Sequence, residues 1–344
     1  MSAPALDPTP IELDAILDHG WLTEALDDVG DGEHVVAVEQ LDRSQTLASK
    51  VRFAATIEAA DGTTRRREYC IKAHFGAGPE TLVSETHVYR EMTPRLTVRT
   101  PRAYYTGIDE RAGRALVIMD DIGSMGGRFL NAFQPYSIDT CRDTLGQLAR
   151  LHAGTWADPQ WEVDWLDPRM GMTAKLFSTE YLQALLDDGR GEHVADELLD
   201  ASRLQAAVAV TAALPETCVI HGDTHSGNVY LDADGRACWL HWQVTQRGHW
   251  SIDVAYHLGT VLDIEDRRAH ERDLVRHYLD ELTANGVADA PSWDEAWERY
   301  TLGFSWGYLL WVITQISSRE VVLVHMPRLG AALADHDTWN RLGV

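Results

Sequence analysis

The chain has 344 residues, of which 45% are hydrophobic and 24% charged, and this is typical of a globular protein long enough for two separate cores. Its 53 acidic and 30 basic residues give a net charge of −23, which argues against nucleic acids and anionic membrane surfaces as partners. The four cysteines lie far apart without metal-ligand spacing, so we expect reduced and mostly buried thiols.

The N-terminal 20 residues do not have the pattern of a secretion signal. They lack both a basic start and an apolar core, so we expect a cytoplasmic protein.

Residues 1–121 are predicted to form a small N-terminal lobe that begins with a helix and is built on an antiparallel sheet. Residues 34–75 contain three strand-like runs, with an Asp-Gly turn at 61–64 between two of them. Residues 80–92 place apolar side chains near helical spacing and are followed by Pro94. Two more apolar runs complete the sheet, and we expect the helix to pack on it.

Residues 122–344 are predicted to form a mainly helical C-terminal lobe. Leucines repeat every three residues between 145 and 151, as on a buried helix face. The uncharged stretch 301–318 contains glycine and polar side chains, which predicts a buried helix rather than a membrane span. The clear β interruption in this lobe is a hairpin centred on Asp234-Gly235.

A polar loop, His221–Asn228, directly follows the apolar run Cys218-Val219-Ile220 and precedes this hairpin. Phosphoryl transfer to a hydroxyl requires a carboxylate that orients the attacking oxygen and accepts its proton, and a nearby amide or acid that binds a metal ion. Asp223 and Asn228 have the chemistry and the spacing for these two roles. A loop without such a function is the alternative.

The loop sequence HGDTHSGN resembles the HGDxHxGN catalytic loop of aminoglycoside phosphotransferases, choline kinases and ecdysteroid-kinase-like proteins. The order of elements is similar over about three quarters of the chain, and the segment WQVTQRGHWSIDVAYHLG also resembles this family. The resemblance implies an α+β, protein-kinase-like fold of two lobes, with ATP in the cleft between them and Mg²⁺ as the metal.

The same resemblance assigns residues of the N-terminal lobe to the nucleotide. Lys72 corresponds to the phosphate-binding lysine at the end of a strand, and Glu85 to its ion-pair partner, with Glu91 as the competing choice. Met119 and Asp121 belong to the expected hinge, where backbone groups would face adenine.

Two positions depart from the family pattern. Residues 41–50 contain no glycine where many relatives have a glycine-rich phosphate loop, so Ser44, Thr46 and Ser49 are the candidates for nucleotide contact, and Ser44 is our choice. His241 precedes Trp242-Gln243 where the family places a metal-binding aspartate.

Four interpretations of His241 remain open. It could mark a nucleotide site without turnover, a site for a softer metal such as Mn²⁺, a non-ligand in a slow enzyme whose metal uses Asn228 and Asp223, or an engineered change. Asp253, further on, resembles a family aspartate that anchors the catalytic loop.

The acceptor is poorly specified by the sequence. Aromatic residues recur at steps of three or four between 293 and 311, which predicts a stripe on one helix that is mostly core. The function that we expect is ATP-dependent phosphorylation of a small-molecule alcohol, with no nucleic acid, membrane or protein partner indicated. The alternative is a nucleotide-binding pseudokinase of the same fold.

Overall fold

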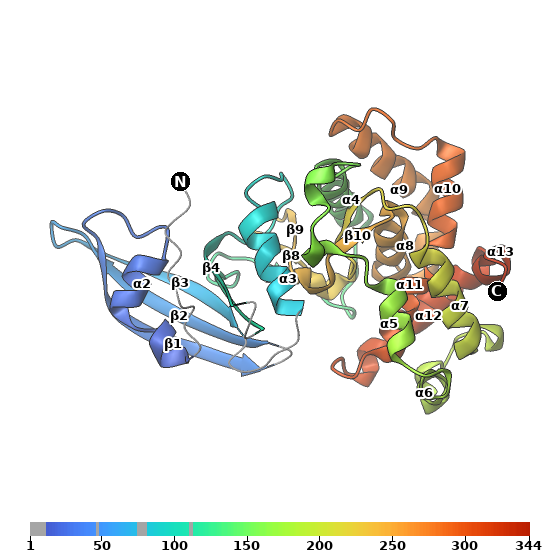
Figure 1. Ribbon diagram of the computed structural model, residues 1–344, viewed down its shortest axis with the longest axis horizontal. Coiled ribbons are helices and arrows are strands. Elements are labelled where there is room, and N and C mark those ends of the chain that lie inside the picture. Colours follow the sequence, from blue (N-terminus) through green and yellow to red (C-terminus); the bar gives the residue numbers. More distant parts are fainter. Residues whose placement is uncertain (1–11, 46–47, 74–80, 110–112) are drawn as a thin grey trace. The chain divides into compact units, whose positions relative to one another are not determined.

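The computed structural model describes residues 12–45, 48–73, 81–109 and 113–344 (Figure 1). The chain divides into two compact units. The first covers Met1–Arg95, Thr100–Arg128 and Asp232–Gly235, and the second covers Leu96–Arg99, Phe129–Leu231 and Arg236–Val344. The first unit contains the large antiparallel sheet and the second is mainly helical, so the expected α+β class is confirmed.

The sheet of the first unit has five antiparallel strands in the order β1-β2-β3-β5-β4. They are β1 (His34–Gln45), β2 (Ser49–Glu58), β3 (Thr64–Ala73), β4 (Ala103–Asp109) and β5 (Arg114–Asp120). The predicted turn between β2 and β3 contains Gly62 with a φ of +81°, a conformation that glycine adopts without strain.

The two faces of this sheet have different chemistry because side chains alternate along each strand. Val51, Phe53 and Ile71 point to the face that packs against Ile16 and Leu22 from α1 (Leu13–Ile16) and α2 (His19–Ala25). The opposite face carries Lys72 and contacts α3 (Thr81–His87), which continues as a π-helical turn over Val88–Met92. The helix predicted over 80–92 is therefore a short α-helix with a different final turn.

The second unit is built around α4 (Ile138–Ala153), α8 (Trp250–Val261) and α9 (Ile264–Ala284), which pack on one another. Its other helices are α5 (Met170–Leu176), α6 (Thr179–Leu185), α7 (Ala201–Ala212), α10 (Trp293–Leu302), α11 (Ser305–Ile313), α12 (Arg319–Asp335) and α13 (Thr338–Arg341). Within the described residues, no helix is both long and apolar enough to span a bilayer.

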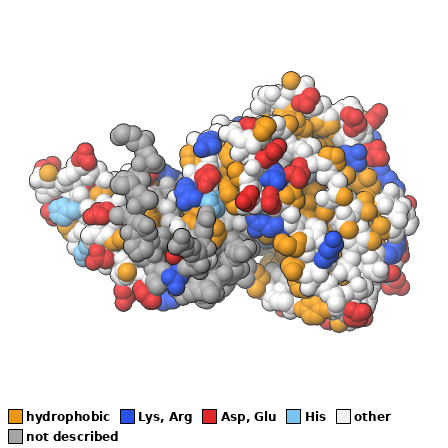
Figure 2. Space-filling model, viewed as in Figure 1, with side chains coloured by type: hydrophobic (Ala, Val, Ile, Leu, Met, Phe, Trp, Pro, Cys, Tyr) orange, Lys and Arg blue, Asp and Glu red, His pale blue; other side chains and the backbone are white. Residues whose placement is uncertain are grey.

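Short strands interrupt the helices: β6 (Arg128–Phe129), β7 (Cys218–Ile220), β8 (Val229–Leu231), β9 (Ala237–Trp239) and β10 (Gln246–Gly248). The predicted hairpin is confirmed, since β8 and β9 pair antiparallel and Gly235 in the joining turn has a φ of +80°. All four cysteines are free thiols, three of them buried, as expected. On the face drawn in Figure 2, acidic side chains are scattered rather than gathered into one patch.

The single aromatic helix predicted between 293 and 311 is wrong, because the chain forms two helices there. α10 ends at Leu302 and α11 begins at Ser305. A Cβ atom on Gly303 would lie 2.7 Å from the carbonyl oxygen of Ser251, so the break occurs where the backbone meets α8 at close range. The stripe is core where it was expected to be, since Tyr300, Phe304 and Tyr308 are fully buried.

Close backbone approach recurs at Gly307 in α11, where it makes room for Tyr256 of α8. A Cβ atom on Gly307 would lie 2.3 Å from Cδ2 of the buried Tyr256 ring. We expect Gly307→Ala to lower the free energy of unfolding by about 1–3 kcal/mol, because the ring cannot move without strain in a packed core. Denaturant unfolding followed by fluorescence measures the loss.

Gly146→Ala in α4 is the matched control. Its Cβ would meet only the end of the Glu281 side chain, at 3.6 Å, an ordinary contact. We expect this helical substitution to be neutral or stabilising by up to about 1 kcal/mol. Equal behaviour of the two variants would contradict the packing argument at Gly307.

Candidate active site

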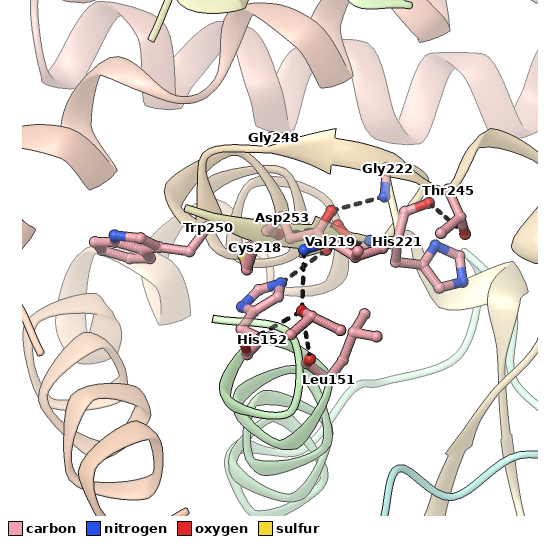
Figure 3. Close-up of polar contacts among 12 residues, drawn as sticks. Leu151, His152, Cys218, Val219, His221, Gly222, Thr245, Gly248, Trp250 and Asp253 are labelled. Carbon is pink, nitrogen blue, oxygen red and sulfur yellow. Dashed lines mark hydrogen bonds and ion pairs between the residues drawn. The ribbon is translucent and has the colours of Figure 1, made fainter. Parts of the chain in front are cut away.

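The loop that follows β7 is held by the buried carboxylate of Asp253 on α8 (Figure 3). Its Oδ2 accepts the backbone N–H of His221 at 2.7 Å and its Oδ1 accepts that of Gly222 at 2.8 Å. The hydroxyl of Thr224 donates to the Asp253 carbonyl at 2.9 Å. Asp253 therefore anchors the loop through three hydrogen bonds, which confirms the expectation from the sequence.

His152 of α4 completes the anchor from the other side. Its Nε2 lies 3.1 Å from Oδ2 of Asp253 (Figure 3). Its Nδ1 lies 2.7 Å from the hydroxyl of Tyr278. All three side chains are buried. Charge-assisted hydrogen bonds of this kind satisfy a buried carboxylate that would otherwise be costly to bury.

Two further residues fix the course of the loop. Gly222 has a φ of +81°, and a Cβ atom there would lie 2.6 Å from the carbonyl oxygen of Val244, so glycine is required. The Nε2 of His221 lies 3.0 Å from the carbonyl oxygen of Leu240, and its Nδ1 accepts the N–H of Asp223 at 3.2 Å. Burial lowers the pKa of His221, so the ring is neutral and braces the loop through these hydrogen bonds.

Both carboxylate oxygens of Asp223 are oriented by neighbouring side chains. The hydroxyl of Tyr256 donates to Oδ1 at 2.9 Å, and Nδ2 of Asn228 donates to Oδ2 at 2.8 Å. Nε2 of His225 lies 3.6 Å from the same Oδ2. The Asp223 side chain keeps 30% of its surface exposed, so the oriented carboxylate is accessible.

The surroundings of Asp223 keep it ionised. Burial alone would raise the pKa of this carboxyl, but the charge of His225 and the hydrogen bond from Tyr256 outweigh that effect and lower the pKa to about 2. A carboxylate with so low a pKa is deprotonated at every pH at which the protein would work.

The amide of Asn228 has only one chemically sensible orientation. Nδ2 lies 2.7 Å from the carbonyl oxygen of Asp223 as well as near its carboxylate, so both amide hydrogens are donated to oxygens. The amide oxygen is therefore the atom left for another ligand. An oxygen donor suits Mg²⁺.

His241 fits Mg²⁺ less well. It is partly buried, and its backbone is left-handed with a φ of +67°, directly before the 3-10 turn Trp242–Val244. Imidazole nitrogen is a ligand for softer metals, whereas Mg²⁺ takes oxygen. Within the described parts of the chain, no three His, Cys, Asp or Glu side chains gather as a metal-binding group. The residues present thus fit Mg²⁺ only in part, through Asn228.

In the first unit, Lys72 and Glu85 form a buried ion pair. Nζ of Lys72 lies 2.5 Å from Oε2 of Glu85, with the two side chains 6% and 1% exposed. The competing partner, Glu91, instead lies 2.7 Å from Nδ1 of His87 and 3.2 Å from Arg90. The geometry thus selects Glu85 over Glu91, while the role of the pair toward a nucleotide stays a prediction.

The predicted hinge residues also lie in this unit. Met119 is buried on β5 opposite Cys70. Asp121 is buried and accepts hydrogen bonds from Nε of Arg52 at 2.5 Å and from the N–H of Ser124 at 3.0 Å. Its carboxylate therefore stabilises the chain after β5, which leaves backbone groups as the candidates for contact with a base.

Two of the three candidates for nucleotide contact in residues 41–50 lie within the described residues. Ser44 is exposed on β1 opposite Lys50, and Ser49 is buried at the start of β2. Thr46 lies outside the described residues. The exposed position of Ser44 does not distinguish it from its neighbours, so its contact with a nucleotide stays a prediction.

Sequence reasoning missed two residues that contact the loop 221–228. Tyr256 contacts Asp223, and Trp306 donates its indole N–H to the carbonyl oxygen of Gly222 at 2.8 Å. Both belong to apolar helical runs, where an aromatic residue that reaches the site has the same pattern as one in the core.

The chain resembles known phosphotransferases in sequence and a known kinase in fold. The model of the phosphotransferase enzyme family matches residues 58–299. An ethanolamine kinase from Plasmodium vivax superposes with a TM-score of 0.53 at 11% identity, covering 96% of each chain. A choline kinase from Streptococcus pneumoniae has a TM-score of 0.49 at 15% identity, covering 88% of this chain and 94% of that one. No curated protein sequence matches significantly.

The kinase-like fold expected from the sequence is thereby confirmed, as is the resemblance on which that expectation was based.

The anchoring of the loop can be tested with Asp253→Asn, which keeps the size of the side chain. One of the N–H groups of His221 and Gly222 would then face an amide NH₂ in place of an oxygen. We expect the free energy of unfolding to fall by about 3 kcal/mol, since hydrogen bonds to a charged group are lost and a buried donor stays unsatisfied. Denaturant titration and amide hydrogen exchange at the two residues measure the effect.

Asp273→Asn provides the comparison for this variant. Asp273 is 69% exposed on α9 and forms only a surface ion pair with Arg276, at 3.1 Å. Such pairs contribute about 0–1 kcal/mol. If Asp253→Asn were no more destabilising than Asp273→Asn, the loop would not depend on Asp253.

Proposed function

The chain belongs to the phosphotransferase enzyme family, and on that premise we propose that it is an ATP-dependent kinase that phosphorylates a hydroxyl of a small molecule. The observation that carries the proposal is Asp223, an ionised, partly exposed carboxylate whose two oxygens are held by Tyr256 and Asn228. A fixed carboxylate of this kind is what phosphoryl transfer to an alcohol requires.

In the proposed reaction, Asp223 accepts a hydrogen bond from the acceptor hydroxyl and aims its oxygen at the γ-phosphorus of ATP. The new O–P bond forms, the bond between the γ-phosphorus and the ADP oxygen breaks, and the hydroxyl proton passes to Asp223. A carboxylate with a pKa of about 2 is a weak base. Its contribution is therefore mainly orientation, with proton acceptance late, as suits a loose transition state.

Lys72 is the proposed contact for the nucleotide phosphates. Glu85 lies 2.5 Å from its ammonium group and would keep the side chain extended toward them. The backbone near Met119 and Asp121 is the proposed contact for adenine, because the Asp121 carboxylate is already used by Arg52 and Ser124. Ser44 remains a proposed contact from the strand end opposite Lys50.

A divalent cation, when bound, would neutralise charge on the phosphates. Asn228 is the proposed oxygen ligand for Mg²⁺, and His241 is the position that would favour Mn²⁺ instead. The imidazole of His241 also supports one rival function, a pseudokinase that binds nucleotide with little turnover.

The proposed acceptor is a small-molecule alcohol. The net charge of −23 disfavours phosphorylated or nucleic-acid acceptors. It does not choose between a cationic and an apolar alcohol, so acceptor identity has to come from a substrate screen.

The central test of the proposed function is Asp223→Asn. We expect transfer to fall by about 10²- to 10⁴-fold, because the variant loses the carboxylate that orients the acceptor hydroxyl and takes its proton late in the reaction, while ATP affinity stays within a few-fold. ATP and ADP affinities from thermal shift and calorimetry are compared with turnover on a panel of alcohols. Asp139→Asn, whose side chain is 96% exposed, serves as control and should behave as the parent chain. Unchanged transfer in Asp223→Asn would remove this residue from the mechanism.

His241→Asp separates the interpretations of the metal position. The left-handed backbone at residue 241 tolerates Asp, Asn and His better than other side chains, so we expect the variant to fold normally. If the imidazole limits Mg²⁺ binding, Mg²⁺-dependent transfer and ATP affinity should both rise by at least about tenfold. The measurement is transfer and ATP affinity with Mg²⁺, Mn²⁺ and Co²⁺.

His241→Asn is the control that supplies an oxygen without a charge. Lower activity of His241→Asp with Mn²⁺ or Co²⁺ would identify a site for softer metals. Turnover that appears only in His241→Asp would establish the pseudokinase alternative for the parent chain. Identical metal dependence in all three proteins would place residue 241 away from the phosphates.

A further inference from the structure

Two lysines lie side by side on the sheet of the first unit. In the antiparallel pairing of β2 with β3, Lys50 is directly opposite Lys72. Directly opposed residues share one face of the sheet, with Cβ atoms about 5 Å apart. Lys50 is therefore on the same face as the Lys72–Glu85 ion pair, opposite the face that packs on α2.

This arrangement has an electrostatic cost in the protein alone. Like charges directly opposite one another are destabilising in a sheet. Burial and then the charge of Lys72 lower the pKa of Lys50, while Cys70 and Glu85 act in the opposite direction. Glu85 is the carboxylate in direct contact with Lys72, and its charge also acts on Lys50.

Lysine is rare in this chain, and two of its few lysines lie at these positions. The chain has 27 arginines and three lysines, Lys50, Lys72 and the exposed Lys175 of α5. Two of its three lysines thus form one cross-strand pair. Two residues after Lys50 on β2, and on the same face of the sheet, Arg52 binds the carboxylate of Asp121 at 2.5 Å.

Arginine and lysine suit different anions. The planar guanidinium pairs with carboxylates, as Arg52 does with Asp121, whereas the compact ammonium acts as a point charge on phosphate. A chain that uses arginine for nine tenths of its Lys and Arg positions but keeps two adjacent ammonium groups is suited to a ligand with several negative oxygens.

We propose that Lys50 is a second phosphate-binding residue, so that ammonium groups from β2 and β3 together hold the polyphosphate of the nucleotide. This inference rests on the proposed function. It also accounts for the absence of glycine from residues 41–50, since side-chain charge from the start of β2 would replace backbone contacts to phosphate. The pair predicts a preference for nucleotides with two or three phosphates over those with one.

The first test compares ATP, ADP and AMP affinities by calorimetry for the parent chain, Lys50→Met, Lys50→Arg and the control Lys175→Met. We expect Lys50→Met to weaken ATP and ADP by about tenfold or more and AMP by much less, because a contact to a charged group is lost. Lys50→Arg should recover part of the loss and Lys175→Met should change nothing. Equal weakening of all three nucleotides, or none, contradicts the inference.

The second test measures how readily each of the three lysines is acetylated. Amine acetylation of the parent chain, read by peptide mass spectrometry, reports on Lys50, Lys72 and Lys175 in one experiment. ATP should protect Lys50 and Lys72 and leave Lys175 reactive, while adenosine should protect neither of the pair. Protection of Lys72 without Lys50 overturns the inference and leaves the proposed function standing.

Failure of the proposed function itself has a different signature. The parent chain would then show neither nucleotide binding nor protection of Lys72. A purely structural role for Lys50 is distinguished by the Tm of the nucleotide-free protein. A purely structural role predicts that Lys50→Met lowers that Tm and weakens ATP, ADP and AMP binding equally, whereas the phosphate-binding role predicts the selective loss of ATP and ADP affinity.

Discussion

The loop of residues 221–228 depends on one buried carboxylate. Asp253 lies in the first turn of α8, where the helix dipole favours a negative charge, and it accepts the backbone N–H groups of His221 and Gly222. A buried anion without such partners would be strongly unfavourable, so carboxylate and loop stabilise each other. His152 from α4 contributes from the opposite side. The loop is thus fixed to two of the central helices of the second unit.

A second set of contacts fixes the orientation of the Asp223 carboxylate. Trp306 binds the carbonyl oxygen of Gly222, and the next residue, Gly307, leaves space for the ring of Tyr256. Tyr256 and Asn228 then fix the two oxygens of Asp223. Helices α8 and α11 therefore set the orientation of the carboxylate together, and packing between them is part of the chemistry of the site.

Local sequence signals were sufficient for the strands, the Asp-Gly hairpin and the polar loop, because turn residues and period-two alternation act over a few positions. The pairing of Lys72 with Glu85 came from the family resemblance, with Glu91 as the competing choice, and the ion pair in the structure selects Glu85. Three features could not be predicted from the sequence because they depend on tertiary contacts. They are the helix break at Gly303, the contact of Tyr256 with Asp223, and the strand register that sets Lys50 opposite Lys72. Register is decided by the pairing of whole strands, which no short motif encodes.

The way in which the loop is anchored has an evolutionary consequence. Asp253 recognises the main-chain N–H groups of residues 221 and 222, which every residue except proline supplies, so these two anchoring contacts do not depend on side-chain identity. Gly222 is an exception, because the backbone leaves no room for a Cβ atom. Such a scaffold lets reactive side chains be exchanged by single substitutions while their places are kept. Single substitutions at those positions can then be accepted without any need to rebuild the fold.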